Sequence, residues 1–186
     1  IGGDGLVLIC RSDVADAKMR MFNADGSEGN MCGNAIRCVG KYLYDENVCR
    51  KEELSVETKS GIKYLRLYTE NGKVKRVRVD MGKACFDPAT LPVRLEGEVI
   101  DRPVNIADGL HRITCVSMGN PHCVLFEDPD TIDLEKVGPL FENDPLFPER
   151  VNTEFVKVIG KNALKMRVWE RGSGETMACG TGACAA

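Results

Sequence analysis

Two cysteines stand in sequence contexts that favour acid–base chemistry. Cys32 is followed by Gly33–Asn34 and Cys179 by Gly180–Gly182, and each comes where a strand-like segment gives way to a helical pattern. Free backbone N–H groups and the helix dipole make the start of a helix favourable for anions. We therefore expect the pKa of each thiol to fall from about 8.5 towards neutrality, so that thiol and thiolate are both populated. A carboxylate can dock on the same N–H groups, because glycine lets its backbone come close.

An internal repeat links the two cysteines. A shift of 147 residues places Cys32 on Cys179, and over positions 18–33 it gives six identities in 16, where chance would give about one. The identical residues of the first copy are Lys18, Met19, Arg20, Glu28, Cys32 and Gly33. One unbroken offset that joins a strand, a glutamate and a Cys-Gly pair indicates a duplication. It predicts two similar domains, 1–82 and 83–186.

Two equivalent cysteine turns suit the inversion of an α-carbon. If a pseudo-two-fold axis relates the halves, an amino acid held by both helix starts has one sulfur on each side of Cα. One thiolate then removes the α-proton while the opposite thiol supplies another, and the helix starts stabilise the charge that grows on the carboxylate. No lysine stands in a pyridoxal-phosphate context and no metal motif is present, so we expect neither a cofactor nor a metal. Oxidation of the empty site is expected to join Cys32 and Cys179 in a reversible disulfide.

The rest of the chain predicts an α+β fold. Alternating polar and apolar residues indicate strands, and helical spacing of apolar residues indicates helices at 33–45 and, at the periphery, 132–141. The strands are expected at 18–22, 54–58, 62–68, 74–81, 111–117, 122–126, 152–158 and 164–169. A hairpin turn is expected at 70–73, and the proline-containing segment 82–92 is expected to cross between the halves.

Several longer motifs resemble the diaminopimelate epimerase family, and the resemblance runs along the whole chain. It rests on Phe22-Asn23-Ala24-Asp25-Gly26-Ser27-Glu28, Met31-Cys32-Gly33-Asn34-Ala35-Ile36-Arg37-Cys38, Gly119-Asn120-Pro121-His122, Val151-Asn152, Trp169-Glu170-Arg171-Gly172-Ser173-Gly174-Glu175-Thr176 and Ala178-Cys179-Gly180-Thr181-Gly182. The resemblance implies interconversion of LL- and meso-diaminopimelate in lysine and peptidoglycan precursor biosynthesis.

By this resemblance, Cys32 and Cys179 are the catalytic acid and base, and His122 and Glu170 tune their pKa values. The residues implied in substrate binding are Asn23, Gly33, Asn34, Asn120, Asn152, Glu170, Arg171, Gly180 and Thr181. Among these, the backbones of Gly33, Asn34, Gly180 and Thr181 are expected to hold the reacting carboxylate, and Asn23, Asn120, Asn152 and Arg171 the distal amino-acid end.

The resemblance also carries expectations about the whole molecule. The family fold has two similar domains, each a strongly curved, mostly antiparallel sheet wrapped round a central helix. It uses no cofactor and commonly forms a homodimer. Both ends of this chain are expected to be truncated: a family Gly-Asn-Asp segment is missing before Ile1, the second central helix is cut short, and Gly5 stands where some members have Gln.

Composition narrows the classes of protein. The net charge is −3 with no basic block, which argues against nucleic acid, and the longest apolar stretch, 6–10, is too short for a membrane span. Nine cysteines without a CxxC pair indicate a reducing cytoplasm. Two alternatives stay open. One is another two-cysteine racemase of the proline-racemase kind, and the other is a non-enzymatic redox or metal-binding thiol protein.

Other residues receive structural interpretations. Glu28 and Glu175, four residues before each cysteine, are as consistent with hydrogen bonding at the helix entry as with chemistry. The segment Gly2-Gly3-Asp4-Gly5 is a weak dinucleotide signal. His111 and the remaining cysteines are interpreted as structural: Cys10, Cys38, Cys49, Cys85, Cys115, Cys123 and Cys184.

Overall fold

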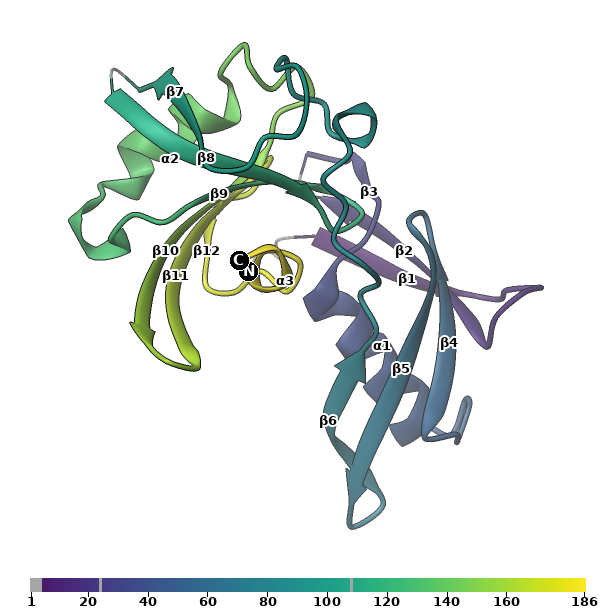
Figure 1. Cartoon of the computed structure of the whole chain (residues 1–186). Helices are drawn as coiled ribbons and strands as arrows, with labels where there is room; N and C mark the ends of the chain where they lie inside the picture. The colour runs from purple at the N-terminus through teal and green to yellow at the C-terminus, as the bar shows by residue number, and fades with distance from the viewer. Residues whose placement is uncertain (1–4, 24, 108) are drawn as a thin grey trace. The chain divides into compact units, whose positions relative to one another are not determined.

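A computed structural model describes residues 5–23, 25–107 and 109–186, and the chain divides into two compact units, Ile1–Gly82 and Lys83–Ala186. Gly2, Gly3, Asp4 and Ala24, which belong to motifs named above, lie outside the described residues. Each unit contains a mixed six-stranded sheet (Figure 1). Among the residues that the structure describes, no helix is long and apolar enough to span a bilayer.

Unit 1 is one sheet with one helix packed on it. The strand order is β1-β2-β4-β5-β6, and a short β3 also pairs with β2. Only β2 and β4 run parallel. Helix α1, Gly33–Asp45, packs chiefly on β6 and β5. The strands are β1 Gly5–Cys10, β2 Ala17–Asn23, β3 Glu28–Gly29, β4 Glu53–Thr58, β5 Gly61–Glu70 and β6 Lys73–Val79.

Helix α1 is amphipathic, and its buried side forms the core of this unit. Ile36, Val39 and Leu43 are almost fully buried and pack with strand residues such as Leu65. Gly40 allows the closest approach, because a Cβ there would lie only 2.7 Å from Leu65 Cδ2. The helix therefore holds its N-terminal end, where Cys32 stands, in a fixed place on the sheet.

Unit 2 is a curled sheet that carries a helix on each face. The strand order is β12-β11-β10-β9-β8-β7, and only β9 and β10 run parallel. In Figure 1 the sheet curls round the short α3, while α2 lies outside the curl. The elements are β7 Arg102–Ile106, β8 Gly109–Ser117, β9 Pro121–Leu125, α2 Leu134–Glu142, β10 Asn152–Gly160, β11 Ala163–Glu170, β12 Gly174–Thr176 and α3 Gly182–Ala185.

Alternation along β9 and β10 divides unit 2 into two cores. The larger core lies on the α2 face and contains Phe141 and Phe155 in edge-to-face contact. The smaller core lies under α3, where Val124 and Val156 pack with Ala185. Side chains of a strand alternate between the two faces of its sheet. His122 and Glu154, two residues from Val124 and Val156, therefore point to the α3 face.

The internal repeat is visible in strand register. Met21 pairs with Gly29 in unit 1, and Val168 pairs with Thr176 in unit 2, so both partners are shifted by 147. The β1–β2 pair and the β10–β11 pair follow the same rule: Val7 faces Met21, and Glu154 faces Val168. Each unit thus builds the same strand, strand, short strand and helix in the same register.

The predicted α+β fold is confirmed, with several differences in the elements. Helix 33–45 and the eight predicted strands are present, although β6 ends at Val79 and α2 begins at Leu134. Four strands were not predicted: β1, β3, β7 and β12. The crossover 82–92 contains the turn η1, Pro88–Thr90, and a single bridge from Cys85 to Ser117.

Candidate active site

Cys179 stands in the turn between β12 and α3, and its sulfur caps that short helix. Its Sγ accepts a hydrogen bond from the Gly182 N–H at 3.3 Å and lies 3.3 Å from Thr181 Oγ1. Its carbonyl accepts from the Ala183 N–H at 3.0 Å. Only 6% of the residue is exposed. The sulfur therefore sits where unpaired N–H groups of the helix start converge.

Cys32 has the same local geometry at the start of α1. Its Sγ accepts from the Ala35 N–H at 3.5 Å, and its carbonyl accepts from the Ile36 N–H at 3.0 Å. Ala35 and Ile36 are the residues that the 147-residue shift places on Gly182 and Ala183. Cys32 is half-buried. Two sulfurs of the chain are thus held as helix caps by one repeated backbone design.

The expectation of a lowered thiol pKa is wrong for Cys179. Burial raises the pKa of this thiol to about 12, and the negative charge of Glu170 adds to the effect. The Thr181 hydroxyl and the Gly182 N–H act in the opposite direction but do not outweigh burial. Desolvation disfavours a thiolate more than one helix start favours it. Cys179 is therefore a proton-carrying thiol at neutral pH.

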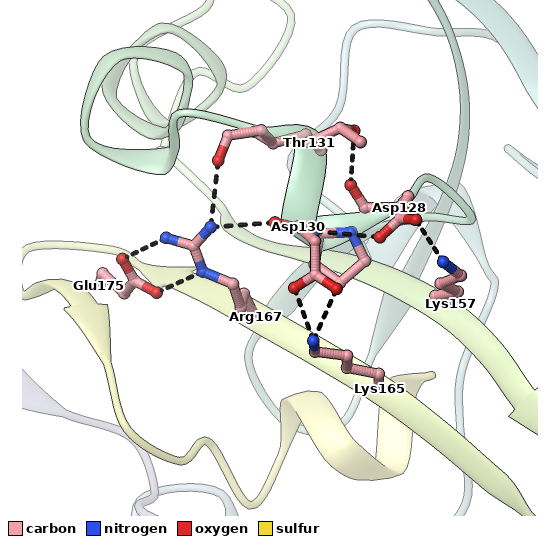
Figure 2. Close-up of polar contacts among 9 residues, drawn as sticks. Asp128, Asp130, Thr131, Lys157, Lys165, Arg167 and Glu175 are labelled. Atoms are coloured by element: carbon pink, nitrogen blue, oxygen red, sulfur yellow. Dashed lines mark hydrogen bonds and ion pairs between the residues drawn. The ribbon is translucent and has the colours of Figure 1, made fainter.

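A short strand before each cysteine is held by an arginine–glutamate pair. Arg167 on β11 donates from Nε and Nη2 to the two carboxylate oxygens of Glu175 on β12, at 2.7 and 2.8 Å. Figure 2 shows the third nitrogen, Nη1, turned to the 129–132 loop, where it donates to two backbone carbonyls. In unit 1, Arg20 Nε donates to Glu28 at 2.7 Å in the equivalent place.

These pairs correct the interpretation of the two glutamates. Neither Glu28 nor Glu175 is found hydrogen-bonded at a helix entry, because each carboxylate faces the arginine of the neighbouring strand. A bidentate arginine–carboxylate pair fixes orientation as well as distance. Each pair therefore holds the short strand before a cysteine against the neighbouring strand.

Three predicted residues of unit 2 form a hydrogen-bonded chain that leads away from Cys179. Thr181 Oγ1 accepts from Asn120 Nδ2 at 3.2 Å, and Asn120 Oδ1 lies 3.1 Å from His122 Nε2. The chain continues to a residue that sequence reasoning missed, since His122 Nδ1 lies 2.6 Å from Glu154 Oε1. His122 and Glu154 are completely buried. The side-chain amide of Asn120 is therefore engaged within the protein at both ends.

The loop after β11 carries Glu170 and Arg171. The Glu170 carboxylate accepts a hydrogen bond from the Thr176 hydroxyl and is close enough to Cys179 to raise its pKa. The Arg171 N–H donates to Asn152 Oδ1 at 2.9 Å, and one guanidinium nitrogen donates to the Glu149 carbonyl at 2.9 Å. Burial lowers the pKa of Arg171, with the nearby positive charge of Arg150 as a second cause.

Two buried side chains hold this loop in place. Asn152 braces it, since Oδ1 accepts from Arg171 while Nδ2 donates to the Pro121 carbonyl at 2.9 Å. Glu142 at the end of α2 accepts from the Gly172 N–H at 2.9 Å and from Trp169 Nε1 at 2.7 Å. Sequence reasoning missed Glu142, because helix 132–141 was interpreted as peripheral and the residue lies one position beyond it.

The remaining predicted residues belong to unit 1. Asn23 Nδ2 donates to the Ser27 hydroxyl at 3.0 Å, which closes the turn before β3. The Gly33 carbonyl accepts from Arg37 Nε at 3.1 Å, and the Asn34 side-chain oxygen accepts from the same guanidinium. Unit 1 thus brings Asn23, Gly33 and Asn34 to the same end of its sheet as Cys32. In unit 2, Glu170 and Thr181 lie close to Cys179, and Asn120 and His122 are linked to it through Thr181. Asn152 contacts Arg171 of the loop after β11.

All nine cysteines are free thiols. Within residues 5–23, 25–107 and 109–186, no group of three or more His, Cys, Asp or Glu side chains is placed to hold a metal ion. The described residues offer two thiols that cap helices, with hydrogen-bond donors beside them.

Comparison with known proteins assigns the family. The diaminopimelate epimerase family matches residues 1–86 and 114–186. This chain belongs to the diaminopimelate epimerase family. Proteins named diaminopimelate epimerase from Agathobacter rectalis and Methanococcus maripaludis are 56% and 57% identical to it. Each alignment covers 100% of this chain and 68% of the relative. The chain is thus an isomerase of this family and spans about two thirds of the relatives' length.

Solved structures share the fold at low sequence identity. A probable proline racemase from Agrobacterium radiobacter, solved with bound carbonate, has a TM-score of 0.70 at 17% identity and covers 96% of this chain and 56% of its own. A hydroxyproline epimerase from Agrobacterium vitis, with bound trans-4-hydroxy-L-proline, has a TM-score of 0.71 at 15% identity and covers 96% and 57%. These likenesses support the fold of the chain and do not decide its substrate.

Proposed function

We propose that this chain catalyses the interconversion of LL- and meso-diaminopimelate by two-base proton transfer at the α-carbon. The observation that carries the proposal is the repeated cysteine turn: Cys32 and Cys179 cap two helices through equivalent N–H groups. Inversion needs one proton to leave one face of Cα while another arrives on the opposite face. A chain with two such thiols supplies both groups without a cofactor.

The two thiols take opposite functions in the proposed mechanism. Because burial raises the pKa of Cys179 to about 12, this residue begins as the acid that supplies a proton. Cys32 then acts as the base for the isomer whose α-hydrogen faces it, and the two exchange functions in the reverse reaction. General acid–base catalysis of this kind contributes about 10²- to 10⁴-fold to the rate.

The substrate carboxylate is proposed to bind the backbone N–H groups beside the thiols. Gly33, Asn34, Gly180 and Thr181 supply these groups at the two helix starts, where anions are favoured. As Cα becomes planar, negative charge moves onto the carboxylate, so the same contacts strengthen in the transition state. In this proposal Glu170 acts on the charge of Cys179 directly, and His122 acts on it through Asn120 and Thr181.

The distal end of the substrate is assigned to the Arg171 loop and to Asn23. Diaminopimelate carries a second ammonium and carboxylate, and a guanidinium binds a carboxylate through two parallel hydrogen bonds. The Arg171 loop is held by Asn152 and Glu142, which keeps its position fixed. A proline-sized substrate has no second charged end to fill this site. A cytoplasmic location and a homodimer remain predictions that accompany the proposal.

The substrate assignment is tested by comparing LL-diaminopimelate, meso-diaminopimelate and L-proline with the purified protein. We expect inversion of both diaminopimelate isomers and none of proline. Arg171→Ala should raise KM for diaminopimelate, because it removes a contact to the distal carboxylate, while its effect on kcat should be smaller. Turnover of proline, or an Arg171→Ala variant with unchanged KM, would contradict the substrate assignment.

A further inference from the structure

Glu154 has no function in the mechanism above, although it is the most deeply buried carboxyl of the site. It is completely buried on β10, and its Oε1 lies 2.6 Å from His122 Nδ1. Its second oxygen, Oε2, is also buried and has no hydrogen-bond partner among the described residues. A buried acid that is retained at this cost needs an explanation.

The repeat shows that Glu154 belongs to one half only. Val7 occupies the equivalent position in unit 1, since both residues face the second strand in the same register. The two units also differ at a second equivalent position, where unit 2 has Gly182 and unit 1 has Ala35. A Cβ on Gly182 would lie 2.5 Å from Glu154 Oε1. The glycine therefore makes room for the carboxyl beneath the Cys179 turn.

The state of Glu154 follows from its two oxygens and its partner. As a carboxylate it would leave a negatively charged Oε2 buried without a donor, which is costly. As a neutral acid, it donates from Oε1 to His122 Nδ1 and leaves only a carbonyl oxygen unpaired. Burial also raises the pKa of Glu154 above its ordinary value of 4.5. The other titratable groups that interact with it are His122 and Cys123 on β9, Glu170 on β11 and Cys179 before α3.

The direction of each hydrogen bond then follows along the chain. If His122 Nδ1 accepts, the neutral imidazole carries its proton on Nε2 and donates to Asn120 Oδ1. The amide nitrogen of Asn120 is thereby turned to Thr181 Oγ1, to which it donates. The Thr181 hydroxyl already has a donor, so its own proton is available for the Cys179 sulfur 3.3 Å away.

We propose that Glu154 is a positioning residue for Cys179, which it serves by fixing the direction of this hydrogen-bond chain so that Thr181 donates to the sulfur. The proposal rests on the acid–base function proposed for Cys179. The chain moves no proton from end to end, because the side-chain amide of Asn120 is not a proton carrier. It acts by orientation, and it stabilises the thiolate that forms each time Cys179 gives up its proton.

If the hydrogen bonds of this chain ran in the opposite direction, the protons would be placed differently. If Glu154 were a carboxylate beside a neutral histidine, Nδ1 would donate to it and Nε2 would accept from Asn120. The Asn120 amide would then be flipped and Thr181 would donate to its oxygen. The sulfur would lose the Thr181 hydroxyl as a donor and keep only the Gly182 N–H. The position of one proton on His122 therefore separates the two arrangements.

The test is ¹⁵N NMR of the purified protein labelled with [¹⁵N]histidine. The chain has two histidines, so a His111→Asn variant assigns the signals of His122. We expect a neutral imidazole with its proton on Nε2. Glu154→Gln should keep this tautomer, because its amide can also donate to Nδ1, whereas Glu154→Met should not. A wild-type His122 protonated on Nδ1, alone or together with Nε2, would overturn the proposal.

Kinetics supply a second readout that a merely structural role would not produce. Glu154→Met and Thr181→Val should each lower kcat by about tenfold, the worth of one hydrogen bond to a charged group. The double variant should lose no more than either single variant, and Glu154→Gln should recover part of the loss. If the losses in kcat of the two single variants added up in the double variant, Glu154 would not act through Thr181, and the proposal would be wrong. Wild-type protein with the Nε2 tautomer but no epimerase turnover would refute the proposed function and leave the proton assignment of Glu154 intact.

Discussion

Replacement of Gly182 by alanine tests the packing beneath the Cys179 turn. In a helix, alanine is favoured over glycine by about 1 kcal/mol, so propensity alone predicts a more stable protein. The added Cβ would, however, lie 2.5 Å from Glu154 Oε1, and 3.1 and 3.2 Å from Glu154 Cγ and Cδ. Glu154 cannot swing away, because it is buried and bonded to His122.

The clash between the added Cβ and Glu154 should cost more free energy than the higher helix propensity of alanine provides. Overpacking of a closed site typically costs about 1–3 kcal/mol, so we expect a net loss in the free energy of unfolding. The equivalent residue of unit 1 is already alanine, where Val7 replaces the acid. The double variant Glu154→Val/Gly182→Ala copies that pair into unit 2. Its loss should be smaller than the sum of the single losses, by about 0.5–3 kcal/mol of coupling.

Fluorescence during urea unfolding measures these losses in unit 2 specifically. Trp169 on β11 is the single tryptophan of the chain, so its emission reports on the unit that contains the substitutions. The reverse change in unit 1, Ala35→Gly, serves as the matched control and should cost about 1 kcal/mol from helix propensity. Its unfolding is followed by tyrosine emission, because all four tyrosines of the chain lie in unit 1. If Gly182→Ala were as stable as the wild type or more stable, the packing argument would fail.

Three further predictions follow from buried or paired groups. Glu142→Gln should destabilise unit 2 by about 1–3 kcal/mol, because it weakens bonds to an indole and a backbone N–H, while Glu135→Gln on the exposed side of the same helix should have little effect in thermal melts. Burial raises the pKa of Glu154, so this carboxyl takes up a proton on folding. The free energy of unfolding should therefore fall as pH rises from about 4.5 through the pKa of Glu154 in the folded protein. Urea titrations over a pH series should show a weaker pH dependence in Glu154→Gln. Mass spectrometry of air-oxidised protein should detect a Cys32–Cys179 disulfide that dithiothreitol reverses, and two free thiols after oxidation would contradict it.

The elements that sequence predicted were those with a regular pattern. Helix 33–45 shows apolar residues at helical spacing, and 54–58 alternates between buried and half-buried positions. Strand β1 was missed because its apolar residues run on without alternation, and β7 because it contains Pro103. Strands β3 and β12 are too short for any period, and their position depends on pairing with a neighbouring strand.

The sequence predicted some residues of the candidate site and missed others, again because only some of them belong to a recognisable pattern. The cysteines and their glycines were visible, because the repeat brings them into one alignment. Glu154 was missed because nothing in its own segment distinguishes a buried acid from an exposed one. A signal was nevertheless present: the 147-residue shift places Glu154 on Val7 and Gly182 on Ala35. A charged residue that replaces an apolar one, together with a loss of volume at a helix start, indicates an acid buried beneath that helix.

In the proposed mechanism, Cys32 and Cys179 act on the same α-carbon. Its most direct test follows inversion and solvent deuterium uptake at Cα of diaminopimelate in D₂O, with wild-type protein and with Cys32→Ala and Cys179→Ala variants. Wild-type product should carry deuterium at Cα, and each substitution should lower the rate of inversion by about 10²-fold or more, because it removes one of the two proton-transfer groups. Inversion at the wild-type rate in either variant would show that the two-thiol mechanism is wrong.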